Sequence, residues 1–516
     1  MALITLAEIF TNDLVVQRQK KIPVWGEGEN GVSVEVEFDS ERVQTVVENG
    51  VWSVEFPPME AASKKKLRVT AKKPDSEETQ EILIENIAVG EVWIASGQSN
   101  MEFLYRYDIE RTTVNEKDED EDLRFFDIPE VSYEGQLEAG HYEDYGFWRS
   151  FKEENADWFS AVGYYFGRKL REKLQVPVGI IGCNWGGSNA ATWTSPQRIQ
   201  EYLETRKVVE DYLDSLKAMD MDAYMKATDY MTAKDPVEER ATTDQFMMGI
   251  PFKEIEAKRK NKQSEEDRQY FMLNMQIGPR SFRRPSGLYE MMLKKILPCE
   301  VRGALWYQGE EDEISRSDFY DVSLTAIINS FRDRWENLPF LIVQLPPFEG
   351  NAFALARKYP VIRKMQQKVS ETLPNVWCAC TTDAGDRNNI HPRHKRPVGE
   401  RLSRLALKHV YGVKVEADSP KAVEIRKEED SVILRFDNTA GGIQIQGEYV
   451  KGLELYVEGY RVHPDIRTEH DLVILTSESL VSVKNQIVVK YAMDNYFEAN
   501  LYNLAGLPVF PFEMVL

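Results

Sequence analysis

The stretch EVWIASGQSNM, residues 91–101, joins an apolar run to a turn of small residues, and it decides the fold class. A short apolar run that ends in Gly97, Gln98 and Ser99 is typical of a buried strand of a parallel sheet. The letters G-Q-S match the start of the G-x-S-x-G nucleophile turn, but Met101 stands where that motif requires glycine. The stretch therefore predicts an α/β sheet. It leaves open whether Ser99 is a nucleophile in another kind of site or a serine in a turn.

Strand-like and helix-like stretches alternate from Ala88 onward. This alternation is typical of a parallel sheet that helices cover on both faces. The expected strands are 176–181, 301–307, 340–345 and 375–382, and the expected helices are 158–173, 319–335 and 398–409.

Regions of alternating β-sequence flank this α/β segment. In the first, Asn49-Gly50 predicts a tight hairpin turn between strands at 43–47 and 51–56, because both residues tolerate positive φ angles. In the second, strands are expected at 432–436 and 486–491. The predicted domains are a β-sandwich at 1–88, an α/β domain at 89–420 with a helical insertion at about 198–274, and a second β domain at 421–516.

Composition narrows the range of partners. The 516 residues include 85 acidic and 64 basic side chains, a net charge of -21, which argues against nucleic acid or an anionic membrane surface and favours a neutral ligand. The sequence shows neither signal-peptide features nor an apolar run of membrane-spanning length, so a cytoplasmic location is expected. The four cysteines, Cys183, Cys299, Cys378 and Cys380, are expected to be buried thiols, and no metal site is predicted.

Four predicted strands are each followed by an unusual loop. In open parallel sheets, ligands bind at the carboxyl ends of the strands. The loops are GQSNM at 97–101, GCNWGGS at 182–188, WYQGEEDE at 306–313 and DAGDRNNIHP at 383–392. Each alone has an ordinary interpretation as a turn, an acidic helix start or a surface histidine. Their joint placement predicts one site.

The four loops hold the groups that acyl transfer requires, namely a hydroxyl nucleophile, a base and donors for an oxyanion. Ser99 offers the hydroxyl and a backbone N–H, Gly187 a second N–H, and Gln308 a side-chain amide. His391 offers the imidazole. The remaining histidines do not directly follow a predicted core strand; they are His141, His394, His409, His463 and His470.

These blocks resemble the SGNH-type esterases of the sialate O-acetylesterase group. Members typically carry GQSNM, a WGGT-like loop, WYQGES and an IHP-x-x-K-x-x-VG-x-RL block, which here reads IHPRHKRPVGERL at 390–402. The similarity extends to RPSGLY at 284–289 and NLYN at 500–503. It covers nearly the whole chain outside the helical insertion.

The resemblance implies a flavodoxin-like sheet and an enzyme that removes acetyl groups from sugars through an acetyl-serine. It implies Ser99 as nucleophile, His391 as general base, and an oxyanion hole formed by Ser99, Gly187 and Gln308. Neither a metal nor an organic cofactor is implied.

The sequence departs from the family near the histidine. Many SGNH enzymes have an Asp three residues before it, and here that residue is Asn388, which cannot carry the charge that steadies an imidazolium. Asp386 or Asp383 could orient His391 instead, or a backbone carbonyl of Asn388 or Asn389 could do so in a dyad. In the third block, Glu311 replaces the commoner Ser.

The sequence leaves two alternatives to a carbohydrate O-acetylesterase. One is a glycan-binding or scaffold protein with an inert α/β domain, which intact catalytic positions disfavour. Another is a glycosidase that uses Glu310 and Glu311, which is disfavoured because adjacent residues do not face each other across a sugar ring.

The sequence leaves the sugar open. Sialic acid would need a basic pocket, for which Arg280, Arg283 and Arg284 are candidates unless acidic groups pair with them. Acetylated xylo- or manno-oligosaccharides are the alternative. The helical insertion could form a pocket wall, a contact in a homo-oligomer, or a solvated appendage.

Overall fold

The computed structural model describes residues 2–74, 76–112, 119–234, 243–250, 252–260, 264–350, 355–483 and 486–516. The chain forms two compact units. The first comprises Met1–Asp244, Lys258–Trp306 and Val322–Phe340, and the second comprises Gln245–Ala257, Tyr307–Asp321 and Leu341–Leu516. These units are defined by contacts between residues, whereas the predicted domains at 1–88, 89–420 and 421–516 are continuous stretches of sequence. The division into three domains therefore stays a prediction.

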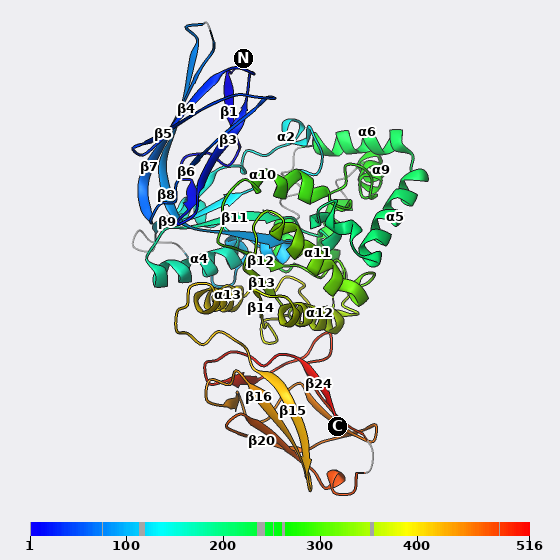
Figure 1. The fold of residues 1–516 in the computed structure, drawn as a ribbon. Helices are drawn as coiled ribbons and strands as arrows, with labels where there is room; N and C mark the ends of the chain where they lie inside the picture. Colours follow the sequence, from blue (N-terminus) through cyan, green and yellow to red (C-terminus); the bar gives the residue numbers. More distant parts are fainter. Residues whose placement is uncertain are drawn as a thin grey trace. The chain divides into compact units, whose positions relative to one another are not determined.

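A large mixed sheet carries the α/β part of the first unit (Figure 1). Its strands here follow the order β10-β9-β11-β8-β12. Their bounds are β8 Thr79–Gly97, β9 Asp120–Asp127, β10 Trp148–Phe151, β11 Val178–Asn184 and β12 Gly303–Tyr307. Strand β11 is parallel to both β8 and β9, whereas β10 runs antiparallel to β9. The parallel sheet predicted from residues 91–101 is therefore present, with an antiparallel strand at its edge.

The centre of this sheet is apolar on both faces. All residues of β11 are buried, and so is the second half of β8. Helix α4 (Ala161–Leu174) packs on β11 and starts at a Ser160 cap, whose hydroxyl accepts the Gly163 N–H. At the start of the buried run, Glu91 forms ion pairs with Arg18 and Arg302, which neutralise its buried charge.

The predicted turn at Asn49-Gly50 is confirmed, but the strands on either side of it pair mainly with other strands. Asn49 and Gly50 have φ angles of 53° and 81°, the left-handed geometry that the pair predicted. The predicted hairpin is reduced to one antiparallel bridge between Glu48 and Val51, because β5 (Glu41–Val46) pairs with β4 (Ser33–Phe38) and β6 (Val51–Phe56) pairs with β3 (Ile22–Gly28). Each strand gains a full ladder with another neighbour, so the turn links two sheets.

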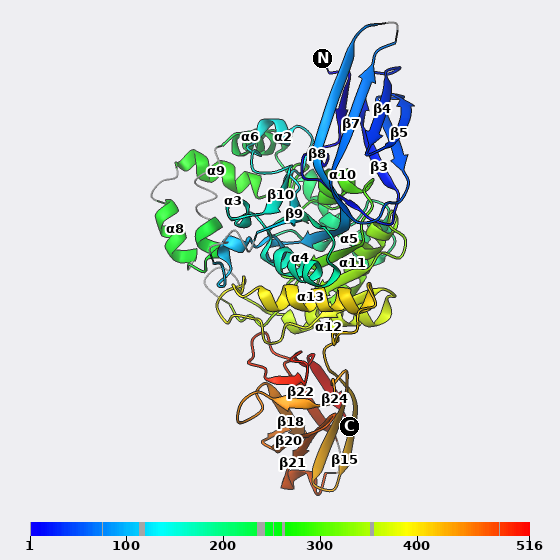
Figure 2. The ribbon, with the colours of Figure 1, turned by 90° about the vertical axis from the view of Figure 1, so that its left-hand side faces the viewer.

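In the second unit, β13 (Phe340–Val343) and β14 (Val376–Ala379) are neighbours in a sheet. Helices α12 (Tyr359–Thr372) and α13 (Arg396–His409) both pack against β14 (Figure 1), and Figure 2 shows the two helices from a perpendicular direction. These elements agree with the strands and the last helix expected from the sequence. Helix α11 (Tyr320–Arg332) likewise lies within its predicted range.

The C-terminal strands of the second unit form a core of their own. One sheet has the order β15-β16-β21-β20 and another has β19-β18-β22-β24. Their bounds are β15 Lys421–Glu428, β16 Ser431–Asp437, β18 Leu453–Val457, β19 Tyr460–Val462, β20 Asp465–Glu469, β21 Leu472–Thr476, β22 Ile487–Tyr491 and β24 Phe512–Val515. Leu434, Leu455 and Val489 are buried together in this core. The strands predicted at 432–436 and 486–491 are confirmed as β16 and β22.

The predicted insertion is helical over its described residues. It contains α5 (Leu203–Lys217), α6 (Met221–Thr232), α8 (Phe252–Lys260) and α9 (Glu265–Asn274). Helices α6 and α9 pack together through Tyr230 and Tyr270, whose rings lie 4.7 Å apart. Within the described ranges, no helix is both long enough and apolar enough to cross a membrane.

Candidate active site

Ser99 begins a short helix directly after the central strand. Strand β8 ends at Gly97, whose φ of 139° is a conformation that favours glycine, and α1 (Ser99–Glu102) follows. The Met101 N–H donates to the Gln98 carbonyl at 2.8 Å, and the Met101 side chain is fully buried. The site thus uses Met101 as a core residue. The second glycine of a nucleophile elbow would leave that space empty.

The glycine turn after β11 lies beside Ser99. The parallel register sets Asn184 opposite Gly97, and the Trp185 N–H donates to the Gly97 carbonyl at 3.2 Å. A Cβ placed on Gly186 would lie 3.3 Å from the Ser99 Cβ. The structure therefore brings these two predicted loops together at the carboxyl ends of adjacent strands.

Gly187 has an unusual backbone angle and a hydrogen bond from Arg283. Its φ of 72° lies in the left-handed region, where a side chain would be strained. Arg283 donates from Nε to the Gly187 carbonyl at 3.0 Å. This hydrogen bond fixes the plane of the peptide bond between Gly187 and Ser188.

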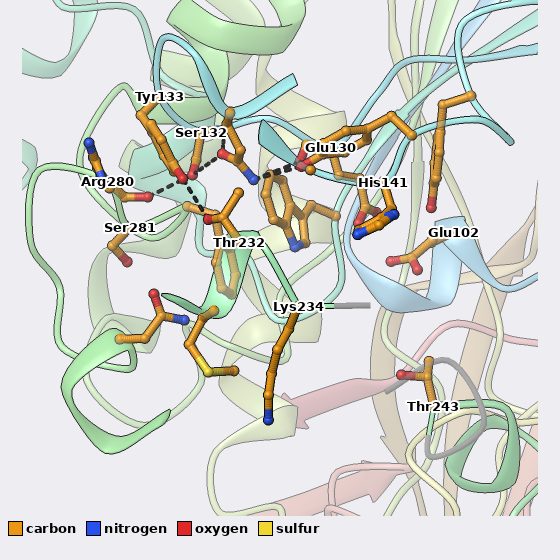
Figure 3. A pocket seen from close by; sticks show the side chains of 18 of the residues that line it. Glu102, Glu130, Ser132, Tyr133, His141, Thr232, Lys234, Thr243, Arg280 and Ser281 are labelled. Carbon is orange, nitrogen blue, oxygen red and sulfur yellow. Dashed lines mark hydrogen bonds between the residues drawn. The ribbon is translucent and has the colours of Figure 1, made fainter. Parts of the chain in front are cut away.

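A pocket of about 440 Å³ in the first unit is lined by Glu102, one helical turn after Ser99, and by Trp185 from the glycine turn (Figure 3). Its aromatic lining also includes Tyr133, Trp158 and Phe282. The insertion contributes side chains from α6 and α9, among them Thr228, Met231, Thr232, Phe271 and Asn274. Of the roles considered for the insertion, the structure thus shows that of a pocket wall.

Three partly buried carboxyl groups line this pocket, and sequence reasoning missed all of them. Burial raises the pKa of Glu102 to about 7. Burial, and then the charge of Glu102, raises the pKa of Asp127 to about 8 and that of Glu130 well above its usual range. Asp127 ends strand β9, so the strand-end rule would have found it had β9 been predicted.

The predicted substrate-binding arginines are paired with acids. Arg280 lines the pocket, pairs with Asp229 and lies over the Tyr133 ring. Arg284 pairs with Glu290 at 3.0 Å and is not among the described residues that line the pocket. The structure therefore gives these two arginines different environments.

His391 is buried in the second unit, with 3% of its surface exposed. Its ring meets the Phe246 ring edge-on at 5.1 Å, and its backbone N–H donates to the Asn389 side chain at 2.9 Å. Burial, and then the charge of Lys395, lowers the pKa of His391 to about 3. The imidazole is therefore neutral at physiological pH, which is the form a general base requires.

The two carboxylates proposed to orient His391 have other partners. Asp383 accepts hydrogen bonds from Arg401 at 2.6 and 2.7 Å and from the Tyr502 hydroxyl at 3.1 Å. Asp386 accepts the backbone N–H groups of Asn388 and Asn389, each at 2.9 Å. Asp386 therefore shapes the loop that leads to His391.

The Gln308 side chain is fully buried in the second unit. Its amide nitrogen donates to Asp312 at 2.7 Å, and its amide oxygen accepts the Tyr320 hydroxyl at 2.8 Å. These contacts fix which end of the amide is nitrogen. They also explain why an acidic residue, Asp312, sits in this loop.

A buried serine at the end of a parallel strand and beside a glycine turn is an arrangement typical of α/β esterases. No group of three or more His, Cys, Asp or Glu side chains within the described ranges could hold a metal ion. Residues 214–408 match the family described as "carbohydrate esterase, sialic acid-specific acetylesterase".

Known proteins resemble the chain over most of its length. It is 24% identical over 487 residues to a sialate O-acetylesterase of Mus musculus, covering 87% of this chain and 81% of that one. The match to the Homo sapiens sialate O-acetylesterase is 24% over 460 residues, covering 81% and 74%. A crystal structure of a carbohydrate acetylesterase from Xanthomonas citri shares the fold, with a TM-score of 0.73 and 24% identity over 99% of both chains.

The family model and these relatives, which are sialate O-acetylesterases and carbohydrate esterases, are similar to the chain, and they support its assignment as a carboxylic ester hydrolase. The resemblance noted in the sequence is thereby confirmed. None of these matches supports the alternative of an inert glycan-binding protein.

Proposed function

We propose that this protein removes acetyl groups from O-acetylated sugars through an acetyl-serine intermediate on Ser99. The observation that carries the proposal is the contact between the Ser99 turn and the Gly186-Gly187 turn, whose neighbours Glu102 and Trp185 line a pocket. Polar side chains and aromatic faces, the two features that sugars need, line that pocket.

The chemistry proceeds in two steps. His391 takes the hydroxyl proton as Ser99 Oγ attacks the acetyl carbonyl, and the sugar oxygen leaves with a proton returned by His391. A water molecule then gives a proton to His391 and attacks the acetyl-serine, which releases acetate and restores the serine. With its lowered pKa, the His391 imidazole is unprotonated before Ser99 attacks, so it can accept the hydroxyl proton.

The proposed oxyanion hole consists of the Ser99 N–H, the Gly187 N–H and the Gln308 amide. Two features support Gly187, namely its left-handed backbone conformation and the close approach of the neighbouring Gly186 to the Ser99 Cβ. The Asp312 and Tyr320 contacts support Gln308, because a preoriented donor needs no reorganisation during the reaction.

We infer that a backbone carbonyl orients His391, as in a dyad. The hydrogen bonds of Asp383 go to Arg401 and Tyr502, and those of Asp386 go to backbone N–H groups. A carboxylate engaged in this way is a poor partner for an imidazole. The carbonyl of Asn388 or Asn389 is the nearer choice along the chain.

We also infer that the catalytic sheet is of the flavodoxin-like SGNH type, flanked by N-terminal and C-terminal β-sandwiches. The parallel pairing of β8, β11 and β9 supports the first part. The separate core of the C-terminal strands supports the second.

Hydrolysis of p-nitrophenyl acetate and of acetylated sugars tests the proposal. We expect acetate release by the wild type, its loss in Ser99→Ala, and full activity in Ser215→Ala, whose serine is exposed on α5. If Ser99→Ala stays folded and keeps wild-type turnover, the proposal is wrong.

A further inference from the structure

We infer that Phe246, a residue of the helical insertion, is a positioning residue that covers the His391 imidazole and shields it from water. The inference rests on the proposed function, because it concerns the base of the same reaction. Three observations carry it, namely the contact between the two rings, the turn that holds Phe246, and the contact of this turn with the loop before His391.

The Phe246 and His391 rings are in direct contact. Their centroids lie 5.1 Å apart and their planes are at 86°, the edge-to-face arrangement that aromatic rings prefer. His391 is buried, whereas Phe246 is half-buried. The Phe246 ring thus stands at the boundary of the buried region, and its removal would open one side of the imidazole to water.

A closed turn fixes the backbone that carries Phe246. The chain is helical up to Met247, and Gly249 has a φ of 82°. The Gly249 N–H donates to the Phe246 carbonyl and the Ile250 N–H donates to the Gln245 carbonyl, each at 3.0 Å. This pair of hydrogen bonds is the Schellman motif, which ends a helix at a glycine in the left-handed conformation. Phe246 therefore lies on a backbone of defined conformation.

The same turn contacts the loop before His391. A Cβ added to Gly249 would lie 3.1 Å from the Asn389 Nδ2 atom. The other end of that amide, Oδ1, accepts the His391 N–H at 2.9 Å. Gln245–Ala257 belong to the compact unit that holds His391, whereas α5, α6 and α9 of the insertion belong to the first unit. This part of the insertion therefore has a task separate from that of the pocket wall.

An apolar cover has a defined effect on a base. Burial is the larger cause that lowers the pKa of His391, and the charge of Lys395 is the smaller. Lys395 is itself buried, with its amino group 5.4 Å from the centre of the Tyr307 ring. On the histidine loop, the Asp386 carboxylate accepts backbone N–H groups. Residues 245–250 carry no charged side chain, so they disfavour the imidazolium and leave the neutral base.

The acid limb of the pH profile tests this cover. Phe246→Ala lets water reach the imidazole, so the pKa of His391 should rise towards its ordinary value of 6.5, and the acid limb should move to higher pH. We expect kcat/KM of this variant for p-nitrophenyl acetate to fall about threefold or more from pH 8 to about 5.5, with the wild type level. Phe246→Leu keeps an apolar side chain and should stay close to the wild type. A level profile in folded Phe246→Ala would overturn the inference.

Positioning is tested at pH 8, where the imidazole is neutral in every variant. Phe246→Ala should lower kcat by about threefold or more with little change in KM, because the imidazole loses a contact that limits its rotation. Phe246→Val, which also removes the ring, serves if Phe246→Ala does not fold, and its effects should have the same direction.

Met248→Ala is the matched control, because Met248 lies on the same turn with 46% of its surface exposed. It should keep the kcat and the pH profile of the wild type. Effects of equal size in Met248→Ala and Phe246→Ala would show a general disturbance of the turn and reject the inference.

A titration without turnover separates this inference from the proposed function. Nuclear magnetic resonance of protein labelled at the histidine rings follows each imidazole with pH, and His391→Gln identifies the His391 signal. The pKa of His391 should be higher by about 1 or more in Phe246→Ala than in the wild type. Equal pKa values would reject the inference even if the esterase is active. A higher pKa would support it even if His391→Gln keeps its turnover, which would reject the proposed role of His391 instead.

Discussion

The region around Ser99 and the region around His391 are both buried, yet they surround their titratable groups differently. Near Ser99, burial raises the pKa of Glu102 to about 7, and burial together with the charge of Glu102 raises the pKa of Asp127 to about 8. Near His391, burial and the Lys395 charge lower the pKa of the imidazole to about 3. Burial disfavours the charged form in each case, which raises the pKa of an acid and lowers that of a base.

This difference assigns separate tasks to the two regions. The serine region offers polar oxygens that suit sugar hydroxyls, in a pocket of about 440 Å³. The histidine region keeps a neutral base against an apolar ring, Phe246. Recognition and proton transfer are thus expected to respond to different substitutions.

The largest effect should come from removing the base. We expect His391→Ala to lower kcat/KM for p-nitrophenyl acetate by about 10³-fold. His394→Ala, three residues further along and exposed, should stay within about twofold because it follows no core strand. Equal losses in the two variants would remove the distinction between these histidines.

On the serine side, Gly187→Ala should lower kcat by about 10²-fold with little change in KM, because it disturbs a donor to the oxyanion. Gly135→Ala is the control for the strain that a side chain suffers at positive φ. Gly135 has a φ of 84°, and nothing lies within 4 Å of the position that an added Cβ would take. That variant should lose stability, about 1 kcal/mol, and keep its kcat. If both variants lose kcat alike, the effect is general strain.

A smaller effect is expected at Asp386. Because its carboxylate accepts two backbone N–H groups, Asp386→Asn should lower kcat by less than about tenfold, whereas loss of a triad Asp costs about 10⁴-fold. A loss of the larger size, with Tm unchanged, would show that Asp386 orients His391.

The pH profile separates the two regions further. Since the pKa of His391 lies near 3, kcat/KM of the wild type should stay level as pH falls through 6.5, as long as the protein remains folded. Lys395→Gln removes a charge that disfavours the imidazolium, so the acid limb should move to higher pH. An acid limb at pH 6.5 in the wild type would contradict this account.

The free energy of unfolding should depend on pH because of Asp127, in the region around Ser99. Asp127 has a pKa of about 8 in the fold against 3.8 for the free side chain, so the stability it contributes is lost as pH rises through 8. Asp127→Asn should therefore raise Tm at pH 8 to 9 by about 2 °C or more, and do little at pH 4. The same Tm difference at both pH values would exclude ionisation as the cause.

Much of the fold follows from patterns in the sequence, because strands buried on both faces and helices with one apolar face leave clear periodicities. Strand β11 and helix α13 lie close to their expected ranges. The partners of β5 and β6 did not follow, because a turn pair such as Asn49-Gly50 specifies local dihedral angles and not which strand offers the better ladder.

The candidate site likewise contains features that the sequence predicts and features that it does not. The proximity of the Ser99 and Gly187 loops could be predicted because adjacent parallel strands end at one edge of the sheet. Asp127 and Glu130 could not, because β9 begins with an acidic run, DEDL, that hides its apolar second half. The pairing of Arg280 with Asp229 depends on contacts between segments distant in sequence, which no local pattern encodes.

Trapping the covalent intermediate tests the central claim most directly. The wild type would be mixed with an acetylated sugar that it hydrolyses, quenched in acid during turnover, digested and analysed by mass spectrometry. The account predicts one added acetyl group on the peptide that contains Ser99, and none on that peptide from Ser99→Ala. Acetylation of a different residue instead, or turnover with an unmodified Ser99 peptide at every quench time, would contradict it.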